Sequence, residues 1–261
     1  MNVILKEKIR PFYNFFLKVS GQLFHRGKKY ICPFCGFLSN DLILIGGKAE
    51  VLKKYEAIGA GRRRGSCWNC QASDKEKLLY IYLRDYAKIF DGSQKSILHI
   101  APEFHLSNQI LRCKNITYTC GDLFAEGYTY PNYVQYMDLL DLQLTDNIYD
   151  IVICAHVLEH IPDDKKAMSE IFRVLKPNGF AIIQVPLSKL LNKTLEDITI
   201  QDPKIRYKLF GQKDHYRLYA QCDYIKNLKD IGFEVEVRNI SVENMKYGLN
   251  PMEDLYICHK K

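Results

Sequence analysis

From Ser96 to the C-terminus, short apolar runs alternate with segments of helical periodicity. The runs ILHIA (97–101), ITYTC (116–120), YDIVICA (149–155) and GFAIIQVPL (179–187) are typical of strands. YDIVICA is apolar almost throughout, as a strand buried on both faces of a sheet should be. Alternating strands and helices over this length predict an α/β fold with a doubly wound parallel sheet.

Helical segments are predicted between and before these strands. Residues 75–90 carry a broad apolar face behind a capping Ser73 or Asp74. A second helix is expected to open at Pro162, where proline is tolerated, and to end at KPNG, residues 176–179. No internal repeat interrupts this order, so residues 92–261 are predicted to form one domain.

Four of the nine cysteines form two matched pairs, Cys32-Pro-Phe-Cys35 and Cys67-Trp-Asn-Cys70. A tight turn places both thiolates of a pair on one side of a metal ion, and two pairs complete a tetrahedron that suits zinc. The alternatives are reduced buried cysteines and a redox pair. We expect a structural zinc in a small lobe with its connecting helix, over residues 31–91. Such a site has no open position for chemistry.

The N-terminal segment, residues 1–30, is predicted to contain an amphipathic helix. Its apolar face comprises Ile9, Phe12, Tyr13 and Phe16. This helix can pack on the body of the protein, or residues 3–24 can lie on an anionic membrane surface. The longest uncharged run, PFYNFFL, is too short to span a bilayer, and no cleavage site follows it. We expect a cytoplasmic protein with peripheral membrane contact as an alternative.

The loop after the first strand, APEF at residues 101–104, lies where cofactors dock in α/β folds, yet it has no glycine. Dinucleotide loops need glycine because the backbone approaches a pyrophosphate. S-adenosylmethionine (SAM) has no phosphate and carries an ammonium group and a positive sulfur. A carboxylate such as Glu103 suits SAM and repels a pyrophosphate. Together with the motif string and the family resemblance described below, this charge argument favours SAM over NAD, FAD or ATP. Glu103 can also be an acid that merely suits a helix N-terminus.

An acid at the end of the second strand, Asp122, can accept hydrogen bonds from both hydroxyls of a ribose. After it comes an ordered series over residues 137–186: a strand-end acid, the string D-x-V-x-C-x-H-V-L-E-H, and a helix ending L-K-P-x-G. This series closely resembles class I SAM-dependent methyltransferases. The resemblance implies a Rossmann-like, seven-stranded methyltransferase sheet with a small N-terminal zinc-binding lobe.

The strings ILHIAPE and FGQKDHYRLYA narrow the resemblance to a bacterial subgroup of these enzymes. Its members have an N-terminal zinc-ribbon-like lobe and often accompany surface-polysaccharide genes. The likeness runs from about Cys32 to Val237. The residues that it assigns to the cofactor, in order from the methionine end through ribose and adenine to the sulfonium, are His99, Ala101, Pro102, Glu103, Asp122, Leu123, Asp138, Leu139, Ala155 and His156. His99 departs from the family, in which most members have an acid, and Ala101, Glu103 and His105 replace glycines.

Methyl transfer from a sulfonium requires that acceptor, methyl group and sulfur be aligned and water excluded. A hydroxyl acceptor also needs a general base, for which histidine is suited. His156, at a strand end, and His215, in an irregular stretch, are the predicted bases, and Asp214 can orient the base or share its proton. His160, one helical turn after His156, is predicted to be structural. A packed or surface role is the alternative for each histidine.

Several basic and polar groups can bind an acceptor. Arg217 and Tyr219 lie in DHYRLY, where such folds form the acceptor pocket, and Arg63 lies in a basic run that can clamp a phosphoryl group. A solvated turn is the alternative for Arg63. We predict O-methylation of a small polar or anionic acceptor, such as a sugar, a nucleotide-activated sugar or another phosphoryl precursor. The resemblance places this reaction in capsule or surface-polysaccharide biosynthesis.

Two other functional classes stay open. The formal net charge of +7 also suits RNA, and the zinc lobe of an RNA methyltransferase could grip ribosomal RNA. A non-catalytic binding protein with the SAM fold is the second alternative, since glycines are replaced. DNA is not expected as a partner. SAM binding separates enzyme from scaffold, and salt-dependent RNA binding separates the two enzyme classes.

Overall fold

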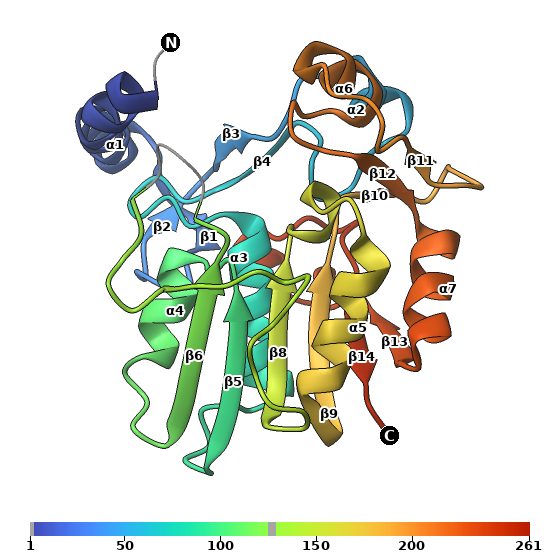
Figure 1. The fold of residues 1–261 in the computed structure, drawn as a ribbon. Coiled ribbons are helices and arrows are strands. Elements are labelled where there is room, and N and C mark those ends of the chain that lie inside the picture. Colours follow the sequence, from blue (N-terminus) through green and yellow to red (C-terminus); the bar gives the residue numbers. More distant parts are fainter. Residues whose placement is uncertain (1–2, 125–128) are drawn as a thin grey trace.

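The computed structural model describes residues 3–124 and 129–261 of the chain (Figure 1). The elements within those residues are α1 (Val3–Phe24), β1 (Arg26–Ile31), β2 (Leu38–Ser39), β3 (Ile43–Ile45), α2 (Glu50–Lys54), β4 (Arg63–Ser66), α3 (Asp74–Ile81), the π-helical turn η1 (Tyr82–Tyr86), β5 (Lys95–Ile100), α4 (Phe104–Ile110), β6 (Ile116–Asp122), β7 (Gln135–Tyr136), β8 (Tyr149–Ala155), the 3-10 turn η2 (Leu158–His160), α5 (Asp164–Val174), β9 (Leu175–Gln184), β10 (Leu187–Ser188), β11 (Leu195–Glu196), α6 (Pro203–Phe210), β12 (Arg217–Ala220), α7 (Gln221–Ile231), β13 (Glu234–Arg238), the 3-10 turn η3 (Met245–Tyr247) and β14 (Leu255–His259).

The central sheet has seven strands in the order β13-β14-β9-β8-β5-β6-β7. Strands β7, β6, β5, β8 and β9 are parallel, and in the middle of the sheet His99 of β5 is paired with Cys120 and Ile153. The prediction of an α/β, Rossmann-like, seven-stranded sheet is confirmed. The chain adds β6 on one side of β5 and β8 on the other side. This topological switch point lies at the carboxyl ends of the three strands, where such sheets bind ligands.

The sheet is mixed, whereas the alternation of elements predicted a parallel one. Strand β14 runs antiparallel to both β9 and β13. Parallel neighbours require a crossover that returns the chain to the same end of the sheet. The segment between β13 and β14 contains only the short turn η3 and does not cross over, so β14 returns in the opposite direction.

Two apolar cores cover the two faces of the sheet. One packs Leu98 and Val152 against residues of α5 and α7, such as Ile171 and Leu228. The other packs Ile97, Ile151 and Ile153 against α3, η1 and α4. Alternate residues of β5 and β8 therefore point to opposite cores, which is why these strands are apolar along their whole length. Figure 1 shows the resulting layers of helix, sheet and helix.

The helix boundaries correct two expectations. Helix α5 begins at Asp164, two residues after Pro162, because the carboxylate of Asp163 accepts a hydrogen bond from the backbone N–H of Lys166 at 3.0 Å and caps it. The helix ends at Val174, and residues 176–179 already belong to β9. The predicted cap of α3 is confirmed, since Ser73 Oγ accepts from the backbone N–H of Glu76 at 3.3 Å.

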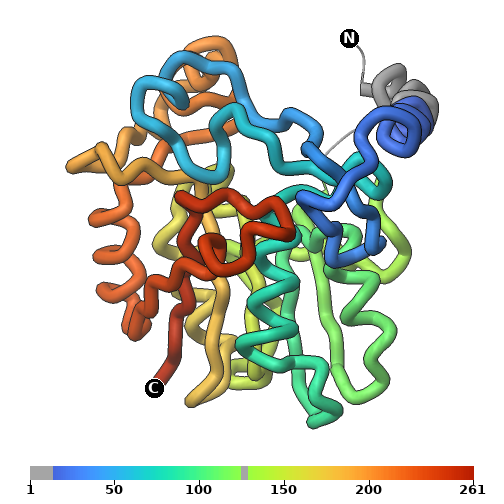
Figure 2. Tube along the Cα trace, turned by 180° about the vertical axis from the view of Figure 1, so that it is seen from behind, coloured from blue at the N-terminus to red at the C-terminus, as the bar shows by residue number. Residues whose placement is uncertain are grey.

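A cap lies over the carboxyl ends of the parallel strands (Figure 1). We use this name for residues 43–66 with residues 187–220, two segments far apart in the sequence. They share a small apolar core that includes Leu52, Ala57 and Leu218, and Ile58 forms a β-bridge with Leu187. Figure 2, seen from behind, shows the cyan first segment and the orange second segment side by side.

The N-terminal helix α1 follows the predicted position, but the side chains of Ile9, Phe12 and Tyr13 lie outside the described residues. Phe16 is exposed, as are Leu23 and Phe24. Contact between this helix and a membrane surface stays a prediction. None of the helices in the described part of the chain combines the length and apolar character needed to cross a bilayer.

Candidate functional site

A cavity of about 580 Å³ lies at the carboxyl ends of β5, β6 and β8. Six of the residues predicted to bind the cofactor line it, namely Ala101, Asp122, Leu123, Asp138, Leu139 and His156. His99, Pro102, Glu103 and Ala155 do not line this cavity. The fold therefore brings residues from the ends of four strands, β5, β6, β7 and β8, together at one cavity, as the predicted site requires.

The end of β5 keeps a glycine-like backbone without a glycine. Ala101 has φ +49°, in the left-handed region, and its N–H donates to the carbonyl of Gly121 at 2.8 Å. This conformation costs an alanine roughly 1–2 kcal/mol. His156, at the end of β8, has φ +60°. Two strained residues on the wall of one cavity are typical of a ligand-binding site.

Glu103 is held by the strand and not by the helix that it precedes. Its Oε2 lies 2.7 Å from Nε2 of the fully buried His99, whose Nδ1 is 2.8 Å from the hydroxyl of Tyr118. The first N–H groups of α4 go to another acid: Glu76 Oε1 accepts from His105 N at 2.6 Å and from Leu106 N at 3.2 Å. Glu103 occupies the N-cap position of α4, but its side chain makes no capping hydrogen bond there, and His99 orients its carboxylate.

The two aspartates that the sequence assigns to the ribose and the adenine both line the cavity. Asp122 ends β6, and burial raises the pKa of its carboxyl group. Its backbone carbonyl accepts from Met137 N at 3.0 Å, which fixes the next strand end beside it. Asp138 Oδ1 accepts from Leu140 N at 2.9 Å and closes a tight turn that leaves Leu139 in the cavity wall.

A histidine cluster stands beside the cavity, and we use this name for His156, Glu159, His160, Asp214 and His215. Glu159 Oε1 is 3.6 Å from His156 Nδ1 and 4.0 Å from His160 Nε2. His160 Nδ1 is 3.3 Å from Asp214 Oδ2, and the rings of His160 and His215 meet edge to face at 4.7 Å. His160, predicted to be structural, lines the cavity together with His156 and Asp214.

Charges within the histidine cluster oppose the effect of burial. Burial lowers the pKa of His215 to about 4 and also lowers that of His156. Burial alone would raise the pKa of Glu159, but the neighbouring His156 and the other histidines bring it down to about 2. The bond to His160 likewise lowers the pKa of Asp214 to about 2, and Asp214 in turn raises the pKa of His160 against the effect of burial.

Arg217 and Tyr219, predicted to bind the acceptor, lie outside the cavity wall. Arg217 is 1% exposed and donates to the carbonyls of Leu158 at 2.8 Å, Ile161 at 2.5 Å and Pro162 at 2.7 Å. It also pairs with Glu196. Tyr219 is buried as well. Arg217 therefore holds the turn that carries the histidine cluster, and its guanidinium has no donor facing the cavity.

A second cleft, of about 1110 Å³, lies between residues 45–75 and residues 203–214. Three cationic side chains line it, namely Arg63, Lys75 and Lys213. Arg63 is anchored by two bonds to Asp74, at 2.5 and 2.7 Å. Asp214 lines this cleft and also the first cavity, so the two spaces meet at its side chain. Lys75 and Lys213 carried no signal in the sequence, because isolated lysines are common on any surface.

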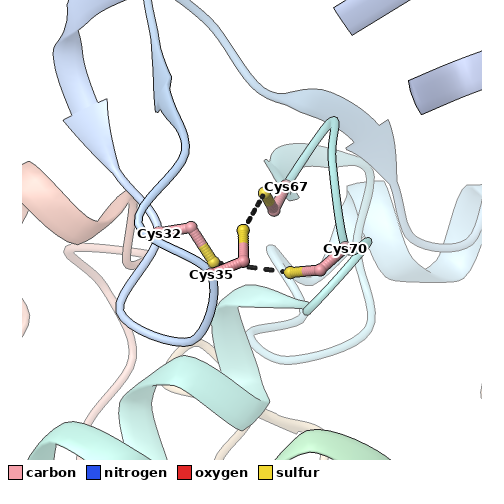
Figure 3. Close-up of side chains that lie close together, drawn as sticks. All are labelled: Cys32, Cys35, Cys67 and Cys70. Atoms are coloured by element: carbon pink, nitrogen blue, oxygen red, sulfur yellow. Dashed lines mark hydrogen bonds between the residues drawn. The ribbon is translucent and has the colours of Figure 1, made fainter. Parts of the chain in front are cut away.

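The four predicted metal ligands come together in the N-terminal lobe (Figure 3). Cys32 Sγ is 3.5 Å from Cys70 Sγ, and Cys35 Sγ is 3.7 Å from Cys67 Sγ. Four sulfurs bound tetrahedrally to zinc at 2.3 Å are about 3.8 Å apart. The cluster is thus compatible with a zinc ion, and its sulfurs face one another across the two turns.

Residues 110–183, which run from α4 to β9, match a family model described as a methyltransferase domain. Residues 110–183 thus carry the sequence pattern of a methyltransferase domain. Within the seven-stranded sheet, the neighbouring strands β7, β6, β5 and β8 position its cavity. The crystal structure of the [4+2]-cyclase SpnF aligns with this chain at a TM-score of 0.50 and 17% identity, covering 68% of this chain and 64% of that one. That likeness shows the fold alone.

Curated relatives resemble the methyltransferase domain over part of their length. A ubiquinone/menaquinone biosynthesis C-methyltransferase of Pasteurella multocida is 33% identical over 126 residues, covering 42% of this chain and 46% of that protein. Phosphoethanolamine N-methyltransferase 2 of Caenorhabditis elegans is 30% identical over 114 residues, covering 41% of this chain and 22% of that protein. The match thus spans less than half of either relative. Their names give carbon and nitrogen as acceptor atoms in those proteins.

Proposed function

We propose that this chain transfers a methyl group from SAM to a hydroxyl oxygen of a small anionic acceptor. The acceptor would be a sugar phosphate, a nucleotide-activated sugar or another phosphoryl precursor of a bacterial surface polysaccharide. The observation that carries the proposal is the meeting of two spaces at Asp214: the cavity of the methyltransferase domain and a cleft lined by Arg63, Lys75 and Lys213. A methyl donor in the first and an anion in the second would be adjacent.

The residues of the cavity fit SAM. Asp122 would accept from the ribose hydroxyls, and Asp138 and Leu139 would flank the adenine. Glu103, which does not line the cavity but follows Ala101 by two residues and is held by His99, would attract the ammonium group. When bound, SAM supplies a methyl group on a positively charged sulfur. The histidine cluster would stand at the acceptor side, exclude water and take the proton of the acceptor hydroxyl.

Turnover of labelled SAM with a panel of sugar phosphates, nucleotide sugars and RNA tests this proposal. We expect label in a phosphorylated small acceptor, as a base-stable ether rather than an ester. Label in RNA alone, with binding that weakens steeply with salt, would instead support the RNA alternative. If the protein binds SAM but transfers no label to any compound in the panel, the result would support the alternative of a non-catalytic binding protein.

Replacement of Asp122 by alanine is expected to weaken SAM binding roughly ten- to hundredfold. The carboxylate would accept charge-assisted hydrogen bonds from the ribose, worth about 1.5–3 kcal/mol. Isothermal titration calorimetry measures the change. Asp141→Asn is the matched control, since Asp141 is exposed and lies outside the cavity wall. Equal SAM affinity of Asp122→Ala and the control would contradict the ribose role.

Replacement of Lys213 by glutamine is expected to raise KM for the anionic acceptor roughly two- to fivefold at low salt and to leave the affinity for SAM unchanged. Lys213 is exposed on the cleft wall, where one charge contact is worth about 0.2–1 kcal/mol. Steady-state kinetics at two ionic strengths show the effect, which should shrink at high salt. Lys229→Gln on α7 is the control, and an equal effect there would contradict a specific role of the cleft.

We also propose that the four thiolates of Cys32, Cys35, Cys67 and Cys70 hold a structural zinc ion. Their spacing and their two tight turns support it. The ion would link the segment that follows β1 to the segment that follows β4, and so position Arg63 and Lys75 at the cleft.

A further inference from the structure

We infer that Glu159, His160 and His215 form a second metal site, for a divalent transition metal ion, between the cavity and the cleft. One ligand atom of each residue lies within 4.8 Å of the others. Two residues come from the turn after β8, and the third comes from the loop between α6 and β12. This site is separate from the cysteine cluster and shares no residue with it.

The spacing of these atoms is slightly wider than a bound ion requires. Nitrogen and oxygen ligands bind zinc at about 2.0–2.2 Å, so in a tetrahedral site they are roughly 3.4 Å apart. Glu159 Oε1 and His160 Nε2 are 4.0 Å apart. Side-chain shifts of less than about 1 Å, within ordinary rotamer adjustment, would bring them to coordination distance.

Buried polar atoms without partners point to a ligand in the same place. His215 is 0% and Glu159 1% exposed. Both ring nitrogens of His215 and Oε2 of Glu159 have no hydrogen-bond partner among the described residues. A buried polar atom left unpaired costs about 1–3 kcal/mol, so native proteins rarely keep several together. One cation here would take one ring nitrogen of His215 and an oxygen of Glu159, and so would provide each of these two buried residues with a partner.

The surroundings of His160 match those of a metal-binding histidine. Its Nδ1 lies 3.3 Å from Asp214 Oδ2, which fixes the ring and leaves Nε2 for the ion. A histidine ligand usually donates its other ring N–H to a carboxylate or carbonyl in this way. The backbone N–H of Tyr216 donates to the carbonyl of Glu159 at 2.9 Å, which locks the loop of His215 against the turn.

The ligand set indicates the class of metal. Two imidazoles and one carboxylate suit Zn²⁺ or Fe²⁺, whereas Mg²⁺ prefers oxygen ligands. Three protein ligands leave a coordination position free, as catalytic sites do. His160 lines the cavity, and Asp214 lines both cavity and cleft, so an acceptor hydroxyl can approach the ion from the cleft side.

The role of this ion rests on the proposed function, although its binding does not. The ion would lower the pKa of the acceptor hydroxyl. Because His160 and His215 would be ligands of the ion and so not available as bases, the hydroxyl proton would then leave to water beside Asp214, whose side chain is 67% exposed. The oxygen then forms a bond to the methyl carbon as the carbon–sulfur bond of SAM breaks, and S-adenosylhomocysteine leaves as a neutral thioether.

Cobalt titration of the full chain tests the site directly. Co²⁺ is added to protein whose cysteine cluster is loaded with zinc, and visible absorption is followed. We expect one equivalent to bind with the weak visible bands of nitrogen and oxygen ligands and without the intense near-ultraviolet absorption of thiolate ligands. A large excess of Mg²⁺ should not displace it. Absence of these bands in protein that binds SAM overturns the second site and leaves the proposed function standing.

Two variants assign the site to its residues. His215→Gln and Glu159→Gln should each weaken Co²⁺ binding at least a hundredfold, and His259→Gln, which replaces a histidine on β14, should leave it unchanged. SAM affinity measured on each variant reports that the domain is folded. Unchanged Co²⁺ affinity in a folded His215→Gln variant refutes the assignment. If the chain binds Co²⁺ but no SAM, the proposed function would be contradicted and the second metal site would stand.

Discussion

Replacement of Cys67 by serine is expected to abolish zinc binding and to disorder the N-terminal lobe. Cys67 is buried in a core that contains only Cys32, Ala72 and a few partly buried neighbours. So small a core cannot hold the lobe alone. Structural zinc contributes about 10–16 kcal/mol of apparent binding free energy in small zinc domains, and that energy is folding energy. The cysteine cluster should hold one zinc ion in the unsubstituted protein and none in Cys67→Ser.

The single tryptophan reports this change locally. Trp68 lies between Cys67 and Cys70, its ring stacks on His25 at 3.7 Å, and its Nε1 donates to Asp41 Oδ1 at 2.8 Å. Its fluorescence should shift to the red in Cys67→Ser. Cys222→Ser is the control, since Cys222 is exposed and lies far along the chain on α7. An unshifted emission together with unchanged zinc content would contradict a zinc-dependent lobe.

The central strands could be predicted from sequence because their signal is local. YDIVICA, residues 149–155, coincides with β8, since a strand buried on both faces leaves an unbroken apolar run. The reversed β14, the two-residue strands β10 and β11 and the four-residue strand β12 with which they pair could not be predicted. Their pairing depends on loop paths and on contacts between distant segments, and a run of two residues carries no periodicity.

Some residues of the site could be predicted and others could not, again because a sequence carries mainly local signals. Asp122 is the last residue of β6, and Asp138 and His156 follow β7 and β8, so their place at one edge of the sheet comes from the strand order alone. The contribution of Glu159 and His160 was missed, although both stand in the string HVLEH. The spacing of that string suggested a helix continuing from His156. The chain instead takes a left-handed residue and a 3-10 turn, which brings His160 to the cavity wall.

Replacement of Arg217 by leucine is expected to destabilise the fold by about 3–5 kcal/mol, the range for removing one member of a buried charge pair, because its buried guanidinium lies 3.7 Å from the carboxylate of the buried Asp164. In sequence Arg217 looked like an acceptor ligand, because nothing local reveals that its partners lie 55 to 59 positions earlier. The substitution removes the side-chain donors that reach three carbonyls of the turn around η2, and it leaves Glu196 without its partner. Urea unfolding followed by far-ultraviolet circular dichroism measures the loss as a lower midpoint.

Two further variants separate this structural role from acceptor binding. Arg238→Leu is the matched control, because Arg238 is exposed on β13 and its closest acid, Glu236, is 3.8 Å away. It should change stability by less than about 0.5 kcal/mol. Arg217→Lys keeps the charge but cannot reach three carbonyls and a carboxylate at once, so most of the loss should persist. If Arg217→Leu unfolds at the midpoint of the unsubstituted chain and only its acceptor KM rises, Arg217 binds the acceptor and the turn is held by its own backbone.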